Sequence, residues 1–259
     1  MERPLEYRKE MVMKNNTAVS YMGIIQQKLQ EIIDTRMGKI LEAAAIVADS
    51  VEQDGILYTF GTGHSHVICE DVSYRAGGLV PVDAINEDAV TGNHKVVQSE
   101  IMERVEGISR VVIDYYDPNP EDAMLIVSNS GRNAAPIEMA MHAKERGMKV
   151  IAITSMEHTQ GTTSRHSSGK KLYQYADVVI DNGAPRGDCV MQLEGMEMPI
   201  GAASGITGMF ILQSIIVQAI QELLDRGVTP PVFMSGNLDG AQDYNKPLMD
   251  KYRGRVRIW

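Results

Sequence analysis

The feature of this sequence that most constrains its fold is an alternation between short apolar runs and longer amphipathic segments, such as the helix predicted over residues 96–116. The runs read as strands and are largely continuous in apolar residues: ILYTF (56–60), LVPVDAI (79–85), AMLIVS (123–128), KVIAITS (149–155) and ADVVID (176–181). Such strands are typical of a sheet whose two faces are both covered by helices. Strands that alternate with helical segments favour parallel βαβ units. The sequence therefore predicts an α/β fold, a three-layer α/β/α sandwich around a central parallel sheet.

Additional long helices are predicted at both ends of this sandwich. Residues 18–51 carry apolar side chains at helical spacing, with Gly38 as a candidate break, and residues 202–227 form a largely apolar segment that ends at a glycine. Residues 1–229 therefore read as one domain. Residues 230–259 contain several Pro, Gly and Asn residues and read as an extended C-terminal tail that wraps over a partner subunit.

The charge of the chain limits its partners. Its 259 residues carry a formal net charge of −9, which argues against nucleic acid because such a partner requires a clear basic face. A phosphorylated small molecule stays compatible with this charge. A few backbone N–H groups supply most of the donors that one phosphate needs.

Cysteine usage and the N-terminal segment favour a reducing compartment. The two cysteines, Cys69 and Cys189, form no CxxC pair, so neither a structural zinc site nor a disulfide framework is indicated. Residues 1–16 are charged rather than typical of a signal peptide, and no run approaches about 18 consecutive apolar residues. We therefore expect a soluble, cytoplasmic protein without a membrane partner.

Small polar residues and glycines follow the strands at the edge where parallel α/β sheets bind their ligands. The most informative segment is SNSGRN (128–133), which we call the serine loop. Ser128, Ser130 and Asn133 can donate hydrogen bonds, Gly131 permits a close backbone turn, and the next helix points its positive end at the same place. Simple capping of that helix would explain one such residue but not the whole cluster. The pattern favours an anion site.

A second segment, the glycine turn GTGHSH (61–66), follows the first strand. It lacks the third glycine of a dinucleotide fingerprint, and no Lys-Ser/Thr follows it as in a P-loop. It also differs from the GxSxG motif of a Ser/His hydrolase. The glycine turn therefore reads as the other half of the anion site, with Ser65 at the start of the following helix.

These two segments resemble motifs of the SIS (sugar isomerase) domain, in which one strand ends in GxGxS and a later one in SxSGxT before a helix. Here Asn133 replaces the usual Thr. The resemblance covers residues 40–225 and is closest to the branch that contains phosphoheptose isomerase and its uncharacterised bacterial relatives. It implies the SIS-type, flavodoxin/Rossmann-like fold, and self-association as a dimer or tetramer whose sites are shared between subunits.

The resemblance also implies which residues hold the phosphate of a phosphorylated sugar. The matching positions are Ser65, Ser128, Asn129, Ser130, Gly131, Asn133 and Ser155. Arg132, inside the serine loop, either contacts that phosphate or points to solvent.

Sugar-phosphate isomerisation needs a base that moves a proton between adjacent carbons and an acid for the oxygens. Glu70 is the first candidate for the base, and His66, four residues earlier on the same helix face, is its acid/base partner. His64 would meet a sugar hydroxyl, and His166 lies among hydroxyl residues after the fourth strand. No metal is expected. A zinc ion at His66 and Glu70 is the weaker alternative, because two ligands are too few to argue from.

The sequence departs from the family pattern at two places. The catalytic glutamate of the isomerase and etherase relatives would fall at Arg75, and the 202–227 segment has no histidine where phosphoheptose isomerases carry one. Glu100, Glu103 and Glu106 read as a solvated helix face. The leading interpretation is a phosphosugar-binding enzyme, an aldose–ketose isomerase that acts through an enediol. The alternatives are an etherase or deaminase on the same scaffold, and a non-catalytic regulatory protein that binds a sugar phosphate.

Overall fold

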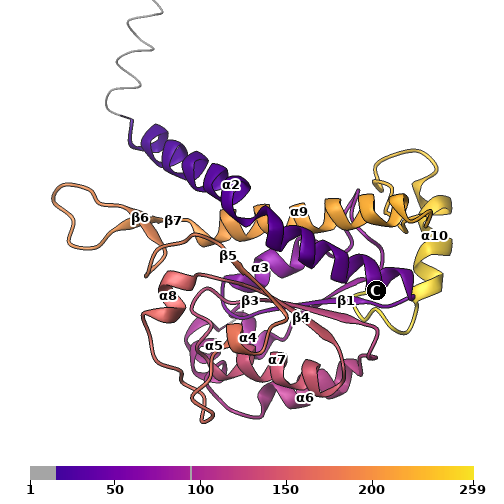
Figure 1. Cartoon of the computed structure of the whole chain (residues 1–259), viewed down its shortest axis with the longest axis horizontal. Helices are drawn as coiled ribbons and strands as arrows, with labels where there is room; N and C mark the ends of the chain where they lie inside the picture. Colours follow the sequence, from indigo (N-terminus) through magenta and orange to yellow (C-terminus); the bar gives the residue numbers. More distant parts are fainter. Residues whose placement is uncertain (1–15, 94) are drawn as a thin grey trace, which may run out of the picture.

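The computed structural model describes residues 16–93 and 95–259 and has a five-stranded parallel sheet at its centre (Figure 1). The strands are β1 Leu57–Gly61, β2 Val82–Ile85, β3 Ala123–Val127, β4 Lys149–Thr154 and β5 Val178–Asp181. Their order is β2-β1-β3-β4-β5, so β2 is an edge strand, as Pro81 indicates. All residues of β1, β2 and β3 are buried, which explains their continuous apolar character. Most of the charged N-terminal segment, residues 1–15, lies outside the described residues.

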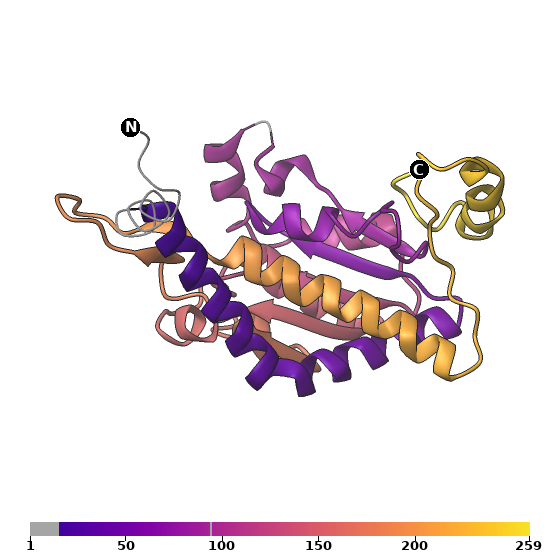
Figure 2. The ribbon, with the colours of Figure 1, turned by 90° about the horizontal axis from the view of Figure 1, so that it is seen from above.

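Helices cover both faces of the sheet, so the predicted three-layer sandwich is confirmed (Figures 1 and 2). The helices of the first face are α2 (Thr17–Glu52), α3 (Ser65–Glu70) and α9 (Ser204–Asp225). The helices of the second face are α4 (Asp88–Thr91), α5 (Val96–Met102), α6 (Ile108–Tyr116) and α7 (Ala134–Glu145). Successive strand residues enter different cores: Leu57 packs with α2 and α9, whereas Tyr58 packs with α6 and α7.

Two helices differ from the sequence prediction. α2 stays one helix of 36 residues across Gly38, and the expected break is only a bend in the ribbon (Figure 2). The prediction of a single helix over residues 96–116 is wrong, because the chain turns at Gly107 and forms two helices, α5 and α6. The φ of Gly107 is +93°, in the left-handed region that favours glycine, and its N–H donates to the Glu138 carboxylate at 2.8 Å.

The C-terminal segment is not an extended tail. Ala241–Tyr252 form a helix, α10, despite Pro247 within it. The segment packs at the edge of the sheet where the strands begin. Arg255 donates to Asp122, the residue before β3, at 2.7 Å, and Lys251 pairs with Asp54, just before β1. This end of the chain therefore lies away from the carboxyl ends of the strands. Wrapping over a partner subunit stays a prediction.

A small antiparallel hairpin, β6 (Cys189–Met191) and β7 (Ile200–Ala202), projects from the sandwich ahead of α9 (Figure 1). Asp188 connects it to that helix, because its carboxylate accepts the backbone N–H of Ala203 at 3.1 Å and of Ser204 at 2.7 Å. The sequence pattern did not predict this hairpin.

Of the described helices, α9 is long and apolar enough, by length and composition, to cross a membrane. Its residues Ile211, Leu212 and Ile215 are fully buried in the core that it shares with α2 and the sheet. α9 is therefore packed as a core helix of the sandwich.

Asp83 on the edge strand gives the fold a pH dependence. Burial raises the pKa of its carboxyl to about 6, although one oxygen accepts the N–H of Arg257 at 2.7 Å. The other oxygen, Oδ1, is buried without a partner. The pKa of Asp83 is thus higher in the folded state than in the unfolded chain. The carboxyl therefore stabilises the fold fully at pH values below its unfolded pKa, and this stabilisation is lost as the pH rises through about 6.

We therefore expect Asp83→Asn to raise the free energy of unfolding at about pH 8, by on the order of 2 kcal/mol. The gain should disappear towards about pH 4, where the wild-type carboxyl is protonated in the fold. Urea denaturation across this pH range measures the difference, with the exposed Asp239→Asn as control. A gain that stays equal at both ends of the range would contradict the assignment to Asp83.

Candidate functional site

The strand order reverses between β1 and β3, so the loops after these strands separate at the carboxyl edge, where such sheets bind ligands. β1 leads into the glycine turn and β3 into the serine loop. β4 leads into α8 (Met156–Gln160) and then into a loop over residues 161–171 that ends at a short 3-10 helix, η1 (Leu172–Gln174). The topology therefore brings the two sequence motifs to one edge of the sheet.

The glycine turn is tight at Gly61. A Cβ atom at this position would lie 2.7 Å from the carbonyl oxygen of Ser65 and 2.8 Å from the backbone nitrogen of His66. The absence of a side chain thus lets α3 begin directly behind the end of β1. Ser65, the first residue of α3, is half-buried, and its hydroxyl has no hydrogen-bond partner among the described residues.

The serine loop turns at Gly131, whose φ is +57°. The N–H of Gly131 donates to the Ser128 hydroxyl at 3.2 Å, which closes the turn. The carbonyl of Asn129 accepts the N–H of Ser155 at 3.1 Å, so the loop is fastened to the end of β4. These bonds fix the shape of the loop.

Several donors of the serine loop are open. The backbone N–H groups of Ser130, Arg132 and Asn133 meet no acceptor in the part of the chain that the structure describes. Asn133 is the N-cap residue of α7, so these groups lie at the positive end of a 12-residue helix. The arrangement is suited to a bound anion.

Ser155 does not contribute to these open donors. It is fully buried, its hydroxyl donates to the carbonyl of Ala184 at 2.6 Å, and it accepts the N–H of His158 at 3.1 Å as the cap of α8. Both contacts are structural. The geometry gives no support to the predicted phosphate contact by Ser155.

Glu103, which reads from the sequence as part of a solvated face, joins the two motifs. Its Oε2 accepts the hydroxyl of Thr62 from the glycine turn at 2.6 Å, and its Oε1 accepts the side-chain amide of Asn133 from the serine loop at 2.7 Å. The carbonyl of Glu103 also accepts the N–H of Ala135 at 3.0 Å. A half-buried carboxylate therefore stands where the two motifs meet.

Positive charge surrounds the serine loop. Arg165 donates to the side-chain oxygen of Asn133 at 2.9 Å, and its backbone N–H donates to the carbonyl of Arg132 at 2.8 Å. Burial, and then the like charges of Arg132 and Arg104, lower the pKa of Arg165. The Nε atom of Arg132 is buried without a partner. Clustered guanidinium groups at this place favour an anionic ligand.

The predicted catalytic pair on α3 does not form. His66 is buried, and its Nδ1 donates to the carbonyl of Gly63, whereas Glu70 is exposed. No hydrogen bond or ion pair joins these two described residues. His64 is exposed at the start of α3. Arg75, at the family's glutamate position, forms an ion pair with Asp71.

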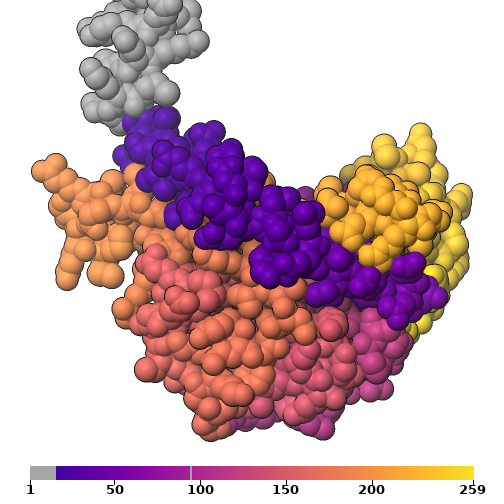
Figure 3. All heavy atoms as spheres, in the orientation of Figure 1, coloured from indigo at the N-terminus to yellow at the C-terminus, as the bar shows by residue number. Residues whose placement is uncertain are grey.

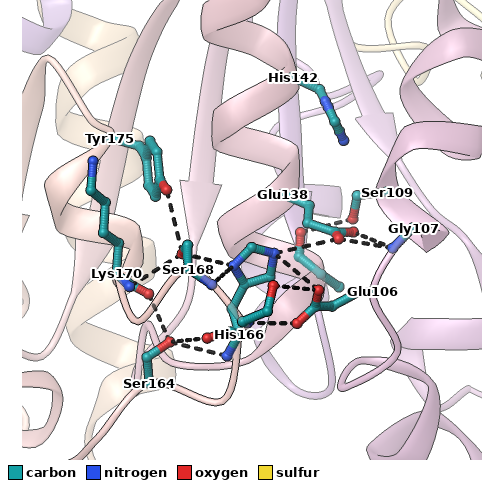
Figure 4. A network of polar contacts seen from close by, with 12 residues as sticks. Glu106, Gly107, Ser109, Glu138, His142, Ser164, His166, Ser168, Lys170 and Tyr175 are labelled. Atoms are coloured by element: carbon teal, nitrogen blue, oxygen red, sulfur yellow. Dashed lines mark hydrogen bonds and ion pairs between the residues drawn. The ribbon is translucent and has the colours of Figure 1, made fainter.

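His166 is the fourth predicted catalytic residue, and its side chain is turned away from solvent. Its Nε2 lies 3.5 Å from Glu138 on α7 and 3.8 Å from Glu106 in the turn after α5 (Figure 4). Two hydrogen bonds from Ser167 lower the pKa of the Glu106 carboxyl. His166 thus belongs to a second polar cluster that the sequence did not reveal.

Comparisons with known proteins agree with the fold. The chain matches the model of the SIS domain over residues 20–155. It is 43% identical over 232 residues to a UPF0309 protein of Halalkalibacterium halodurans, a match that covers 90% of this chain and 96% of the relative. The phosphoheptose isomerase from Neisseria gonorrhoeae has a TM-score of 0.56 and 16% identity, covering 79% of this chain and 97% of the other.

The NanR protein of Vibrio vulnificus, solved in complex with ManNAc-6P, is similar over 95% of this chain and 72% of its own, with a TM-score of 0.51 and 14% identity. At these low identities the structural matches show the fold alone. The family itself follows from the SIS model, which spans more than half of the chain, and from the UPF0309 relative. The resemblance inferred from the two motifs is confirmed, and the chain belongs to the SIS domain family, with UPF0309 proteins among its relatives.

Proposed function

We propose that this protein binds a phosphorylated sugar at the carboxyl edge of the sheet, with the phosphate on the serine loop and Ser65. The open N–H groups of the serine loop and the neighbouring guanidinium groups support an anion at this place. Phosphosugars are also ligands on the same fold, since the structure of NanR contains ManNAc-6P. A phosphorylated sugar is a charged metabolite, which fits the cytoplasmic location expected from the sequence.

The position of Glu103 carries the proposal of an enzyme. Its carboxylate lies beside the phosphate donors and is oriented by Thr62 and Asn133. It would take the proton from the sugar carbon next to the carbonyl and return it to the adjacent carbon through an enediol, while the proton of the neighbouring hydroxyl passes to the carbonyl oxygen, so that an aldose becomes a ketose. Glu103 therefore replaces Glu70 as the proposed base. Ether cleavage or loss of a sugar amine would begin with the same proton removal.

A non-catalytic sugar-phosphate-binding regulator is the second candidate. The observation in its favour is that the His66/Glu70 pair does not form and that α9 carries no histidine. Under this alternative, Glu103 only fastens the glycine turn to the serine loop.

The test of ligand binding is a thermal-shift panel of aldose, ketose and amino-sugar phosphates, with the unphosphorylated sugars and a nucleotide as controls. A ligand at about 100 times its Kd should stabilise the fold by about 2.7 kcal/mol. Ser65→Ala removes one open hydroxyl and should reduce that shift. If a nucleotide raises the melting temperature and no phosphosugar does, the proposed ligand class is wrong.

We also propose that α2 and α9 form an interface between copies of the chain. The exposed side chains of Met37, Leu41 and Val217 give these helices an apolar surface, and a groove between them is lined by Met37, Met209 and Phe210. Figure 3 shows α2 running across this face of the molecule beside α9. Covering such a surface favours a dimer or tetramer.

Val217→Glu is expected to convert the oligomer to a monomer, because it places a charge in the apolar contact. Size-exclusion chromatography with light scattering measures the mass. A wild-type chain that is already monomeric at high concentration would contradict the interface.

A further inference from the structure

Three segments that are distant in the sequence bring together Glu106, Glu138 and His166 (Figure 4). Glu106 lies in the turn between α5 and α6, Glu138 in α7, and His166 in the loop after α8. One potential ligand atom from each lies within 4.8 Å of the others. The side chains of Glu138 and His166 are only 8% and 6% exposed, so the cluster is built into the fold rather than formed by chance at the surface.

Among the described residues, the only side chain that can balance the negative charge of this cluster is His166, and only when its ring is protonated. Both oxygens of Glu138 accept the N–H of Gly107 at 2.8 Å, and Glu106 accepts the N–H and hydroxyl of Ser167 at 2.6 and 2.7 Å. These donors are neutral. Within the described residues, neither carboxylate pairs with a lysine or arginine. Two adjacent carboxylates, one of them buried, are stabilised by a nearby cation.

The distances suit a divalent ion. The Nε2 atom of His166 lies 3.5 Å from Oε1 of Glu138 and 3.8 Å from Oε2 of Glu106. Ligands bound to one tetrahedral ion at about 2.0–2.1 Å are about 3.3–3.4 Å apart, so small side-chain movements would complete the site. The other nitrogen of His166, Nδ1, lies 2.8 Å from the Ser168 hydroxyl and accepts the backbone N–H of Ser168 at 3.2 Å, so Ser168 fixes the orientation of the ring.

We propose that Glu106, Glu138 and His166 bind a divalent first-row transition metal such as Zn²⁺ or Mn²⁺. One imidazole and two carboxylates suit these ions better than Ca²⁺ or Mg²⁺, which take oxygen ligands. The site differs from the His66/Glu70 pair, whose members do not meet. Because Arg165 precedes His166 and donates to Asn133 at 2.9 Å, the ion would fasten the 161–171 loop beside the serine loop.

The test is direct metal binding to the tag-free chain after treatment with EDTA. Isothermal titration with Zn²⁺ and Mn²⁺, and the visible absorption of Co²⁺, should show one site in the wild type. Because the side chain of Glu106 is partly exposed, the variant Glu106→Gln should keep the fold. It should weaken the affinity for the metal ion about 10-fold to 100-fold or more, and His166→Gln should weaken that affinity further. His142→Gln is the matched control, since His142 lies on α7 and pairs with Glu145 outside the cluster.

Two outcomes would overturn the proposal: a wild-type chain that binds none of these ions, and variants Glu106→Gln and His166→Gln that bind them as tightly as wild type. Metal binding is measured without any sugar phosphate, so its failure leaves the proposed phosphosugar ligand unaffected. Circular dichroism of each variant separates loss of the site from loss of the fold.

Discussion

Replacing Glu103 by glutamine should abolish proton transfer on the bound sugar while leaving phosphate binding intact. Glutamine has the same size as the glutamate side chain and keeps one acceptor oxygen, so Thr62 or Asn133 can still donate a hydrogen bond to it. It cannot take a proton from carbon. Loss of a general base reduces turnover by about a hundredfold to ten-thousandfold. Phosphate binding should be equal or tighter, because the variant removes a negative charge next to the proposed anion cradle.

The measurement does not require the physiological substrate to be known. Aldose and ketose phosphates are incubated with the protein in D₂O, and proton NMR follows the loss of the C–H signal next to the carbonyl. A thermal shift with the same sugar phosphate measures binding. Glu70→Gln is the matched control, because Glu70 is exposed on α3 and should exchange the proton at the wild-type rate.

The outcomes separate the candidate functions. Loss of exchange in Glu70→Gln alone would restore the sequence-based choice of base. Binding of a sugar phosphate without any exchange in the wild type would favour the regulator. Exchange that persists in both variants would exclude both carboxylates as the base.

The sheet was predictable because its signal is local. Each strand is a short apolar run, and the strands other than β2 are followed by the small polar residues or glycines that a parallel sheet presents at its carboxyl edge. The two SIS motifs lie on such strand ends, so their meeting follows from topology. The position of the glycine turn with Ser65, and that of the serine loop, could therefore be predicted from the sequence.

The carboxylate that joins the glycine turn to the serine loop was not predictable in the same way. Glu103 forms hydrogen bonds with Thr62, which is 41 residues away in the sequence, and with Asn133, which is 30 residues away. The residues around Glu103 carry no sequence pattern that predicts either contact. The spacing of Glu100, Glu103 and Glu106 suggested one exposed helix face. In the structure, α5 ends at Met102, so Glu103 and Glu106 lie in the turn that follows and point to different partners.

The C-terminal helix was missed for a related reason. The segment AQDYNKPLMDKY is polar and contains Pro247, which reads as a tail. Its position depends on contacts with remote residues, such as Arg255 with Asp122 and the backbone of Arg257 with Asp83. Composition alone does not show such contacts.

Gly61→Ala is expected to be among the most damaging single substitutions at the glycine turn. The added Cβ would lie 2.7 Å from both the carbonyl carbon and the carbonyl oxygen of Ser65, a contact that real Cβ atoms do not make. Backbone atoms cannot move aside by changing rotamer, so α3 must shift away from the end of β1. Overpacking of this kind costs about 3 kcal/mol. The shift also moves Ser65, so the stabilisation by a sugar phosphate should be lost.

Gly63→Ala, two residues later in the same turn, is the matched control. Its φ of +50° makes alanine strained, at a cost of roughly 1–2 kcal/mol, but no neighbouring atom lies within 4 Å of the added Cβ. Urea denaturation and the thermal shift with a sugar phosphate compare the two variants. If close packing rather than backbone strain governs the turn, Gly61→Ala must lose more stability and more ligand response than Gly63→Ala. Equal losses would mean that backbone conformation sets the shape of the turn, and that Ser65 does not depend on the contact between β1 and α3.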